Sequence, residues 1–538
     1  MIKIKKTKND GITIITLVIT IIILLILAGT AIFSVLGENG LITKTKQAKS
    51  FADKAQFEEN VDMLITMYQI TSTTDTNKNA YAELTETLNK YGYSYEKNDN
   101  ILKITYKQYS KEINLSENDK EDDEALKWLT ENDLLVSKNN LDKYSSTYNN
   151  IKEGTVFLNY NINEKEIYNP RDLSLASAQY GLALISSFNK TKNNKYLEMA
   201  KLIGNNIIEN KTFEKEYAHA SEEKGEKLTC ITSQMKMNNG KWTYDSQYYT
   251  YPLDSLMSCK LLIELTNKTE DTKYAEKALK VIDTWIYIQD KVGTGALPSY
   301  MYYTSELSWG EGMWPIWTEF PLDISYSLYL SGISAYKYTG EIKYKKFVDD
   351  YFSFVNNAFT NYNATFSFVK NGNTYKLPYE YVCKTSETTY VGKNQSNQTF
   401  VDSEKNDITT DQLFYMVLGL ALYDKDSNYV TEFLKSINEI QFENGKFWGE
   451  YTINGEKGSF EENSVEILNS AFYIRLLRIC DQTDNIPNII KMLTANRKKS
   501  NDKNVNGSWT WDAKETSYVI ETLATSVILQ EVYTNGMP

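Results

Sequence analysis

One long apolar run opens the chain, and apolar residues recur at helical spacing through most of the remaining sequence. The run from Ile12 to Leu36 holds 25 uncharged residues, and as a helix it would be about 37 Å long. A bilayer core is about 30 Å thick, so we expect this run to span a membrane. Lysines in a basic leader at 1–11 predict a single-pass cell-membrane protein whose C-terminal part is extracellular. They are Lys3, Lys5, Lys6 and Lys8.

The stretch from 37 to 116 mixes two periodicities and predicts a small α+β stalk. Apolar residues between Ala48 and Tyr68 keep three- and four-residue spacing, which is typical of one helical face. Alternation in ILKITY is typical of a strand. An acidic linker is expected at 117–124, with a solvated helix start as the alternative. The expected elements of the stalk are a helix at 80–91 and strands at 101–106 and 109–115.

The remainder of the chain, 125–538, carries a helical repeat. A phrase with a tyrosine near its start recurs at Tyr196, Tyr274, Tyr344 and Tyr429, at intervals of 78, 70 and 85 residues. Such a period, with two helices and a loop in each unit, indicates a repeat architecture. Twelve helices are expected, near 125–136, 172–189, 194–210, 254–267, 272–290, 322–339, 341–359, 410–424, 427–441, 463–482, 486–498 and 515–533.

Helices of this repeat alternate in polarity. The helices that begin near 172, 254, 322, 410, 463 and 515 are the more apolar set, and their partners carry more Lys and Glu. A helix that is apolar all round is buried, so six inner and six outer helices are expected. The predicted fold class is mainly α, an (α/α)6-type toroid with short β-hairpin loops, preceded by the stalk and a transmembrane helix. The 125–136 helix would close it beside the last inner helix, and an open helical solenoid is the alternative.

Composition excludes several classes of function. The net charge is 58 − 70 = −12 and the pI is near 5.0, so no basic face for nucleic acid is expected. His219 is the single histidine, and the four cysteines are far apart. The sequence contains no metal-binding motif, so we expect neither a metal nor a cofactor.

Acidic residues begin the predicted inner helices. Asp is a favoured N-cap and acids favour helix N-termini, so each position has a structural explanation. In a toroid all of these ends would nevertheless open on one face, where they would form an acidic pocket. The residues are Asp172, Asp254, Asp323, Asp411, the pair Glu461–Glu462 and Glu515.

The loop at 292–323 is the densest mixture of aromatic residues and carboxylates. Aromatic planes stack on the apolar faces of sugar rings, and glycoside hydrolysis needs two carboxyl groups. We expect Glu311 or Glu319 to be the general acid, with Asp411 or Asp254 as its partner. Alternatively, the aromatic residues plug the mouth of the toroid. The residues expected to bind substrate are Trp242, Tyr244, Trp309, Trp314, Trp317 and Trp511.

The first sixty residues resemble the leader and first helix of type IV pilins and pseudopilins. The matching features are the lysine-rich leader, Gly11 directly before Ile12, and the apolar run ITIITLVITIIILLILAG. The resemblance implies cleavage between Gly11 and Ile12, with a prepilin peptidase and other pilin-like subunits as partners. Thr16 occupies the fifth mature position, where that family usually carries Glu. A plain membrane anchor is the alternative.

Residues 120–538 resemble the α/α-toroid carbohydrate-active enzymes, namely the six-hairpin glycosidases and related polysaccharide lyases. The matching features are the KYxxxA-type outer helices and the loop phrases NGKW, NGKF and NGSW before inner helices. The resemblance implies an extracellular enzyme of carbohydrate metabolism that acts on a polysaccharide or oligosaccharide, with hydrolysis by paired carboxylates as the leading hypothesis.

Two alternatives belong to other classes. A pilin-like surface protein would bind glycan without turnover. A uronate lyase or C5-epimerase would use a tyrosine or histidine as its base and would need basic subsites, for which only four arginines are available. The candidate bases are Tyr244, Tyr248, Tyr302 and His219.

Overall fold

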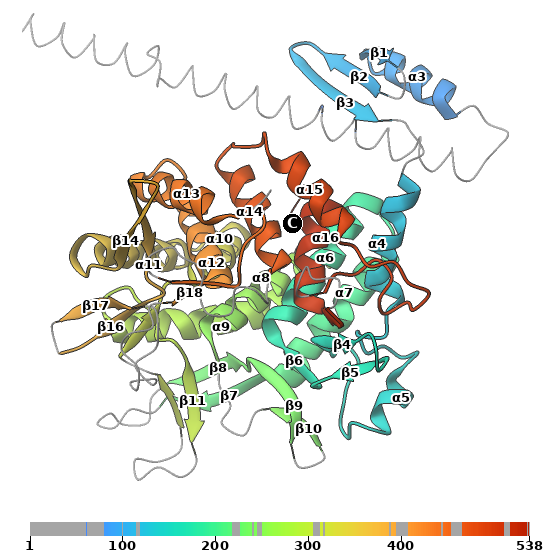
Figure 1. The fold of residues 1–538 in the computed structure, drawn as a ribbon. Helices are drawn as coiled ribbons and strands as arrows, with labels where there is room; N and C mark the ends of the chain where they lie inside the picture. Colours follow the sequence, from blue (N-terminus) through green and yellow to red (C-terminus); the bar gives the residue numbers. More distant parts are fainter. Residues whose placement is uncertain are drawn as a thin grey trace, which may run out of the picture. The chain divides into compact units, whose positions relative to one another are not determined.

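The structure, a computed structural model, divides into two compact units, residues 1–119 and 120–538 (Figure 1). The leader at 1–11 with Gly11, and the apolar run with Ile12, lie outside the described residues. The residues that the structure describes are 57, 61, 80–98, 101–114, 119–217, 226–238, 241–244, 250–304, 312–315, 318–386, 389–393, 407–442, 445–452, 465–510, 517–534 and 536.

The expected membrane location requires a correction. Among the described residues, no helix combines the length and the apolar character needed to cross a bilayer. This finding contradicts the predicted single-pass cell-membrane protein with an extracellular C-terminal part, which depended on the run at 12–36. The partners inferred from a pilin-like segment are likewise unsupported.

The first unit contains a helix and a three-stranded antiparallel sheet in the order β1-β2-β3. Leu102 and Ile104 alternate with polar residues along β2, and they pack with Leu84 and Leu88 of α3. The expected helix and both expected strands are present, and β1 is an additional strand. The elements are α3 (Ala80–Lys90), β1 (Ser94–Asn98), β2 (Ile101–Tyr106) and β3 (Tyr109–Asn114).

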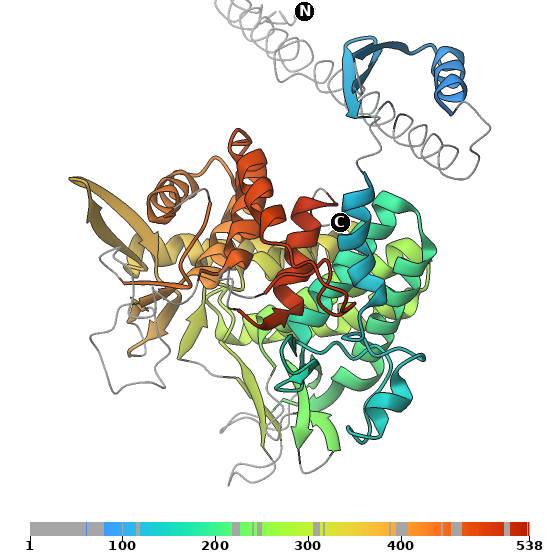
Figure 2. The same cartoon turned by 45° about the vertical axis from the view of Figure 1, so that its right-hand side comes forward.

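An inner ring of six helices forms the centre of the described part of the second unit. Each helix packs against the next, and α16 packs against α6, so the ring closes. In both views the red C-terminal helices lie beside the helices that begin the unit (Figures 1 and 2). This closure confirms the toroid and excludes the open solenoid. The inner ring consists of α6 (Ser174–Thr191), α8 (Pro252–Thr269), α10 (Ser325–Thr339), α12 (Thr410–Tyr423), α14 (Ile467–Ile479) and α16 (Thr522–Val532).

Outer helices pack against the inner ring, so all twelve expected helices are present among the described residues. The tyrosine of the repeated sequence motif connects neighbouring outer helices. Tyr274 is buried at the start of α9, and its hydroxyl donates to Asn205 Oδ1 of the preceding outer helix at 2.9 Å. In the first helix of the unit, α4, Trp128 contacts Tyr180 of α6. The outer helices are α4 (Asp119–Glu131), α7 (Asn194–Asn206), α9 (Thr272–Val292), α11 (Ile342–Asn361), α13 (Asn428–Ile440) and α15 (Ile486–Ala495).

Short strands lead into the inner helices, and β6 to β11 lie together below the ring in Figure 1. In the described part of the second unit, three sheets have three strands, in the orders β10-β9-β6, β13-β16-β17 and β20-β4-β5. The remaining elements are α5 (Leu141–Ser145), a π-helical turn (Ile207–Lys211), β4 (Asn159–Asn161), β5 (Glu166–Tyr168), β6 (Arg171–Leu173), β7 (Thr212–Glu216), β8 (Lys227–Ile231), β9 (Gln234–Asn238), β10 (Lys241–Tyr244), β11 (Met301–Thr304), β12 (Gly312–Pro315), β13 (Glu319–Pro321), β14 (Thr365–Lys370), β15 (Asn373–Pro378), β16 (Tyr381–Lys384), β17 (Tyr390–Lys393), β18 (Asp407–Thr409), β19 (Glu450–Thr452) and β20 (Val519–Glu521).

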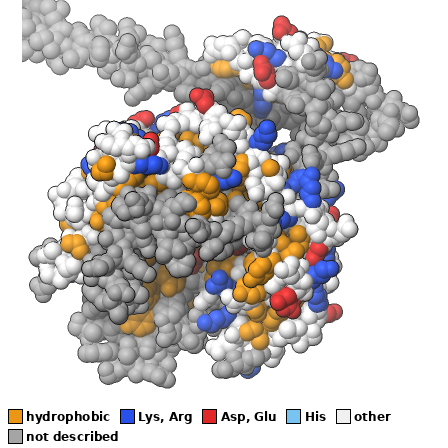
Figure 3. Space-filling view, viewed as in Figure 1, with side chains coloured by type: hydrophobic (Ala, Val, Ile, Leu, Met, Phe, Trp, Pro, Cys, Tyr) orange, Lys and Arg blue, Asp and Glu red, His pale blue; other side chains and the backbone are white. Residues whose placement is uncertain are grey.

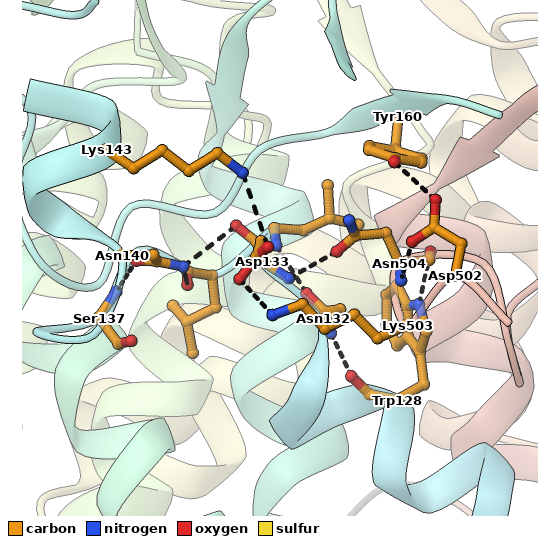
Figure 4. A network of polar contacts seen from close by, with 12 residues as sticks. Trp128, Asn132, Asp133, Ser137, Asn140, Lys143, Tyr160, Asp502, Lys503 and Asn504 are labelled. Carbon is orange, nitrogen blue, oxygen red and sulfur yellow. Dashed lines mark hydrogen bonds and ion pairs between the residues drawn. The ribbon is translucent and has the colours of Figure 1, made fainter. Parts of the chain in front are cut away.

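A polar network joins the first and last segments of the toroid (Figure 4). Asn504 accepts the Asp133 backbone N–H at 2.7 Å and the Trp128 indole N–H at 3.0 Å. Lys503 Nζ lies 2.8 Å from Asp133 Oδ1, and the Tyr160 hydroxyl donates to Asp502 at 2.8 Å. The asparagine-rich loop at 501–507 therefore connects the two ends of the ring.

A buried charge network lies within the inner ring. Arg475 of α14 donates to Glu531 Oε1 of α16 and to the Tyr326 hydroxyl of α10, both at 2.7 Å. The Glu531 side chain is 0% exposed and also bonds Arg478. The neighbouring Gln530 donates to the Gln179 carbonyl of α6 at 3.0 Å. Four inner helices are therefore linked through adjoining polar groups.

Replacing Arg475 by Met should lower the free energy of unfolding by about 3 kcal/mol or more, because it leaves part of a buried carboxylate uncompensated. Urea unfolding of the full chain, followed by tryptophan fluorescence, measures this change. Lys425→Met is the matched control, since it breaks an exposed pair with Asp481 and should cost less than about 1 kcal/mol. Equal effects of the two substitutions would contradict the central role of the network.

Candidate active site

Carboxylates stand where chain segments enter the inner helices. Asp254 and Asp411 lie in the first turns of α8 and α12, Asp323 lies two residues before α10, and Glu521 ends β20 directly before α16. Asp254, Asp411 and Glu521 are half-buried, and Asp323 is 8% exposed. At the last helix the adjoining acid is thus Glu521, while Glu515 and the pair Glu461–Glu462 lie outside the described residues.

Glu380, which directly precedes β16, connects two of these helix starts. Its carbonyl accepts the Leu322 N–H at 2.8 Å, and its Oε1 accepts the Thr409 N–H at 2.7 Å. With its side-chain amide turned to donate, Gln412 lies 2.9 Å from Glu380 Oε2. Glu380 is 4% exposed, and burial raises its pKa well above the ordinary value. It therefore ties the Asp323 segment to the Asp411 segment.

Burial and two other acids at the starts of inner helices raise the pKa of Asp323. Burial, together with the charges of Asp411 and Asp254, raises its pKa to about 7. Glu521 also has a pKa of about 7, because burial and the charge of Asp411 outweigh the attraction of Arg171. The carboxyls on α8, α10, α12 and α16 are therefore close enough to shift one another's ionisation. They form what we call the acid cluster: Asp254, Asp323, Glu380, Asp411 and Glu521.

Asp254 differs from Asp323 in its surroundings. Its pKa is raised to about 6 by burial, an increase that a hydrogen bond with Ser233 and the charge of Lys211 reduce. Asp254 is therefore the more acidic of these two carboxyls, and Asp323 holds its proton more strongly. Two carboxyls whose pKa values are separated by their environments are the arrangement that general acid–base chemistry needs.

Several buried polar atoms near the N-terminal ends of the inner helices have no hydrogen-bond partner among the described residues. The Tyr415 hydroxyl on α12 is one, and the charges of Asp411 and Asp254 both act on it. Others are Asn469 Oδ1, at the start of α14, and Glu521 Oε2. An unsatisfied buried polar atom is costly, so these atoms are candidates for contacts with a polar ligand.

Asp172, the acid before the first inner helix, is not available for such chemistry. Its side chain is 0% exposed and its Oδ1 lies 2.6 Å from Lys211 Nζ. It also accepts hydrogen bonds from Ser177 and from the Val156 backbone N–H. Asp172 is thus a partner in a buried ion pair.

The expected general acids have different positions. Glu319 lies in β13 with 1% of its surface exposed, so it lies behind the surface of the site. Glu311 lies outside the described residues, as do Trp309, Trp317 and Trp511. Of Trp314 and Tyr244 only the backbone is described, in β12 and β10.

Trp242 was expected to bind substrate, but it is 4% exposed and packs in a T-shaped contact with Phe157, with 5.6 Å between ring centroids. It takes part in lining a cavity of about 200 Å³ beside Asn206 and Glu209. Among the alternative bases, Tyr302 is half-buried against Tyr300. His219 and Tyr248 lie outside the described residues.

Sequence reasoning did not select Glu380 or Glu521 as site residues. Glu380 follows a hairpin far from any helix start, so no helical pattern marks it. Glu521 directly precedes an apolar inner helix. An acid in that position is the pattern used for the other inner helices, but the sequence analysis places the start of the last helix at Glu515. Among the described residues, no group of three His, Cys, Asp or Glu is placed to hold a metal ion.

Charged side chains of both signs are interspersed on the described surface in Figure 3.

The raised pKa of Asp323 predicts a pH-dependent effect on stability. Its folded-state pKa of about 7 exceeds that of a free Asp, about 4, so the native state keeps a proton that the unfolded state loses. Stability therefore falls as the pH rises through this window. Asp323→Asn should gain about 2–4 kcal/mol on the wild type between pH 4 and pH 8.

Urea unfolding at the two pH values measures this gain. Asp484→Asn is the control, because Asp484 is exposed and its substitution should leave the difference between the two pH values unchanged. A pH-independent effect of Asp323→Asn would contradict the prediction.

No model of a known protein family matches the sequence, and no curated protein matches it. Similar solved structures include an α-amylase from Clostridium perfringens, which is 12% identical with a TM-score of 0.49 and covers 78% of this chain and 98% of its own. Unsaturated glucuronyl hydrolase from Bacillus sp. GL1 is 10% identical with a TM-score of 0.47, covering 77% and 95%. A D-mannose isomerase is 10% identical with a TM-score of 0.49, covering 80% and 100%. Similarities at this level establish neither a family nor a reaction.

Proposed function

We propose that residues 120–538 form a glycoside hydrolase that acts on a polysaccharide or oligosaccharide. Asp323 is the general acid in this proposal, and Asp254 is the ionised partner. The observation that carries the proposal is that Asp323 is buried, with 8% of its surface exposed, beside the acids Asp411 and Asp254, an environment that raises its pKa to about 7.

Hydrolysis of a glycosidic bond needs one carboxyl group that holds a proton and one that does not. The proton of the first goes to the leaving oxygen as the bond to the anomeric carbon breaks. The second supplies the base or the nucleophile on the other side of the sugar. Asp323 fits the first role and Asp254 the second, because Lys211 and Ser233 favour the ionised form of Asp254.

Asp411, which the sequence suggested as the partner of the general acid, receives a different role in this proposal. Its charge is the larger of the two that raise the pKa of Asp323, so it helps to hold the transferable proton. Glu319 and Glu311 are not used in the proposal, since Glu319 is fully buried and Glu311 lies outside the described residues. Tyr415 and Asn469 supply buried polar atoms for sugar hydroxyls.

Asp323→Asn should lower kcat by about 10²–10⁴-fold, because the amide cannot donate a proton as a carboxylic acid does. Binding of the same oligosaccharide should persist. Release of reducing ends from a panel of neutral and charged polysaccharides measures the rate, and titration calorimetry measures the affinity. Asp484→Asn should match the wild type. A wild-type protein that binds glycan without cleaving any member of the panel would indicate a binding protein instead.

The two carboxyls also predict a bell-shaped dependence of activity on pH. The acid limb should lie near pH 6, where Asp254 loses its proton, and the basic limb near pH 7, where Asp323 loses its own. The profile of kcat/KM reports these groups in the free enzyme. A basic limb that is unchanged in Asp323→Asn would assign the proton donor to another residue.

A further inference from the structure

A cavity of about 310 Å³ lies where outer helix α11 meets the end of α12 and the start of α13. Phe352 and Phe359 line it from α11, while Tyr423 and Tyr429 line it from the other two helices. The three helices lie together in Figure 1. A pocket of this volume can hold a small ligand, and ligand pockets typically combine aromatic walls with a few polar groups.

The cavity is separate from the acid cluster, although α12 contributes to both. Asp411 lies in the first turn of α12, and Tyr423 is the last residue of the same helix. A helix rises 1.5 Å per residue, so these two positions are about 18 Å apart along its axis. A ligand in the cavity therefore leaves the candidate active site open.

Two pairs of aromatic rings form the walls of the cavity. Tyr423 stacks on Phe352 with 4.3 Å between ring centroids and 8° between ring planes. Tyr429 packs against Phe359 with 4.9 Å between centroids. Phe352 is 3% exposed, whereas Tyr423 is 41% exposed. A buried ring thus supports an exposed one, which keeps aromatic surface of Tyr423 open at the edge of the cavity.

Polar side chains stand beside these rings. Asn356 is exposed on α11, and Asp424 and Ser427 lie in the connection between α12 and α13. Asp424 Oδ1 accepts the Asp426 backbone N–H at 3.3 Å, which orders the carboxylate. Ser427 Oγ accepts the Val430 backbone N–H at 3.2 Å, so its own hydroxyl proton can still be donated. The cavity therefore offers an amide, a hydroxyl donor and a carboxylate acceptor.

This combination of groups suits a neutral carbohydrate. The C–H face of a sugar ring packs on an aromatic plane, while its hydroxyls donate to a carboxylate and exchange hydrogen bonds with an amide. A wholly apolar ligand would leave the polar groups of the cavity desolvated and unpaired, which is costly. An anionic ligand would be repelled by Asp424 and by Asp349, whose Oδ1 lies 3.4 Å from the Tyr423 hydroxyl.

We infer that the cavity at Tyr423, Asn356 and Asp424 is a second carbohydrate-binding site, which takes a neutral oligosaccharide. Its role in turnover rests on the proposed hydrolase, because a chain held here raises the local concentration of its remaining sugars near the acid cluster. Binding itself does not depend on that hydrolase, since the cavity contains none of the proposed catalytic residues.

The test measures binding at the cavity itself. Hydrogen–deuterium exchange of the full chain is followed by mass spectrometry while maltopentaose, cellopentaose or mannopentaose is titrated. At least one of these sugars should slow exchange in peptides covering 352–359 and 420–430, because a bound ligand suppresses local opening. The concentration dependence of this protection gives the dissociation constant of the cavity. Absence of protection there with all three sugars would overturn the inference.

Substitutions at Tyr423 separate binding from packing. Tyr423→Ala should weaken the dissociation constant by about tenfold, because the stacking ring is lost. Tyr423→Phe keeps the ring and should stay within about threefold of the wild type. An unchanged dissociation constant in Tyr423→Ala would show that the ring has only a packing role and would overturn the inference. Pentagalacturonate, an anionic probe, should bind more weakly than the best neutral sugar, and tighter binding would refute the neutral class.

The matched control is Tyr338→Ala. Tyr338 is 39% exposed near the C-terminal end of the neighbouring inner helix α10, but it does not line the cavity. Its substitution should leave the dissociation constant unchanged, and a loss equal to that of Tyr423→Ala would contradict the assigned site. A wild-type protein that shows this protection but releases no reducing ends would refute the proposed hydrolase while supporting the second binding site.

Discussion

Closure of the inner ring is the constraint on which the rest of the structure depends. The last inner helix must pack against the first, and the contact between them is not purely apolar. Glu531 is buried between Arg475 and Arg478, and Gln530 reaches the backbone of α6 at Gln179. In a low-dielectric interior such a network is strongly unfavourable unless every partner is present. Its completion therefore accompanies the correct closure of the ring rather than a slipped or open arrangement.

A closed ring has a chemical consequence, because the N-terminal ends of the inner helices come to lie around a common centre. Helix dipoles favour ionised carboxylates there, whereas burial and mutual repulsion favour the neutral form. The balance differs from one acid to the next. Asp323 has two acidic neighbours and keeps its proton to about pH 7, while Asp254 has Ser233 and Lys211 beside it. The same geometry that closes the ring thus gives neighbouring carboxyls different pKa values.

The aromatic residues show how one sequence signal can have two meanings. The loop phrases before inner helices place Trp242, Phe447 and Trp509 at corresponding positions, and all three are buried. The indole of Trp509 donates to the Leu493 carbonyl at 2.8 Å, and Phe447 packs edge-on against Phe414. These residues fill the space between loop and helix, so their recurrence reflects packing of the repeat. A Trp beside a carboxylate is equally suitable for binding sugar, and only burial distinguishes the two roles.

The sequence by itself determined the twelve helices and their division into inner and outer sets, because helical periodicity and polarity are local properties. The choice between a closed toroid and an open solenoid was made by the packing of α16 against α6. The sequence also indicated Asp254, Asp323 and Asp411 as acids at helix starts. Only the tertiary structure decided that Asp172 forms an ion pair with Lys211 and that Glu319 is buried. It also decided that Glu380 forms hydrogen bonds with the segments that precede α10 and α12. These outcomes depend on contacts between segments far apart in the chain, and on desolvation, which no local pattern encodes.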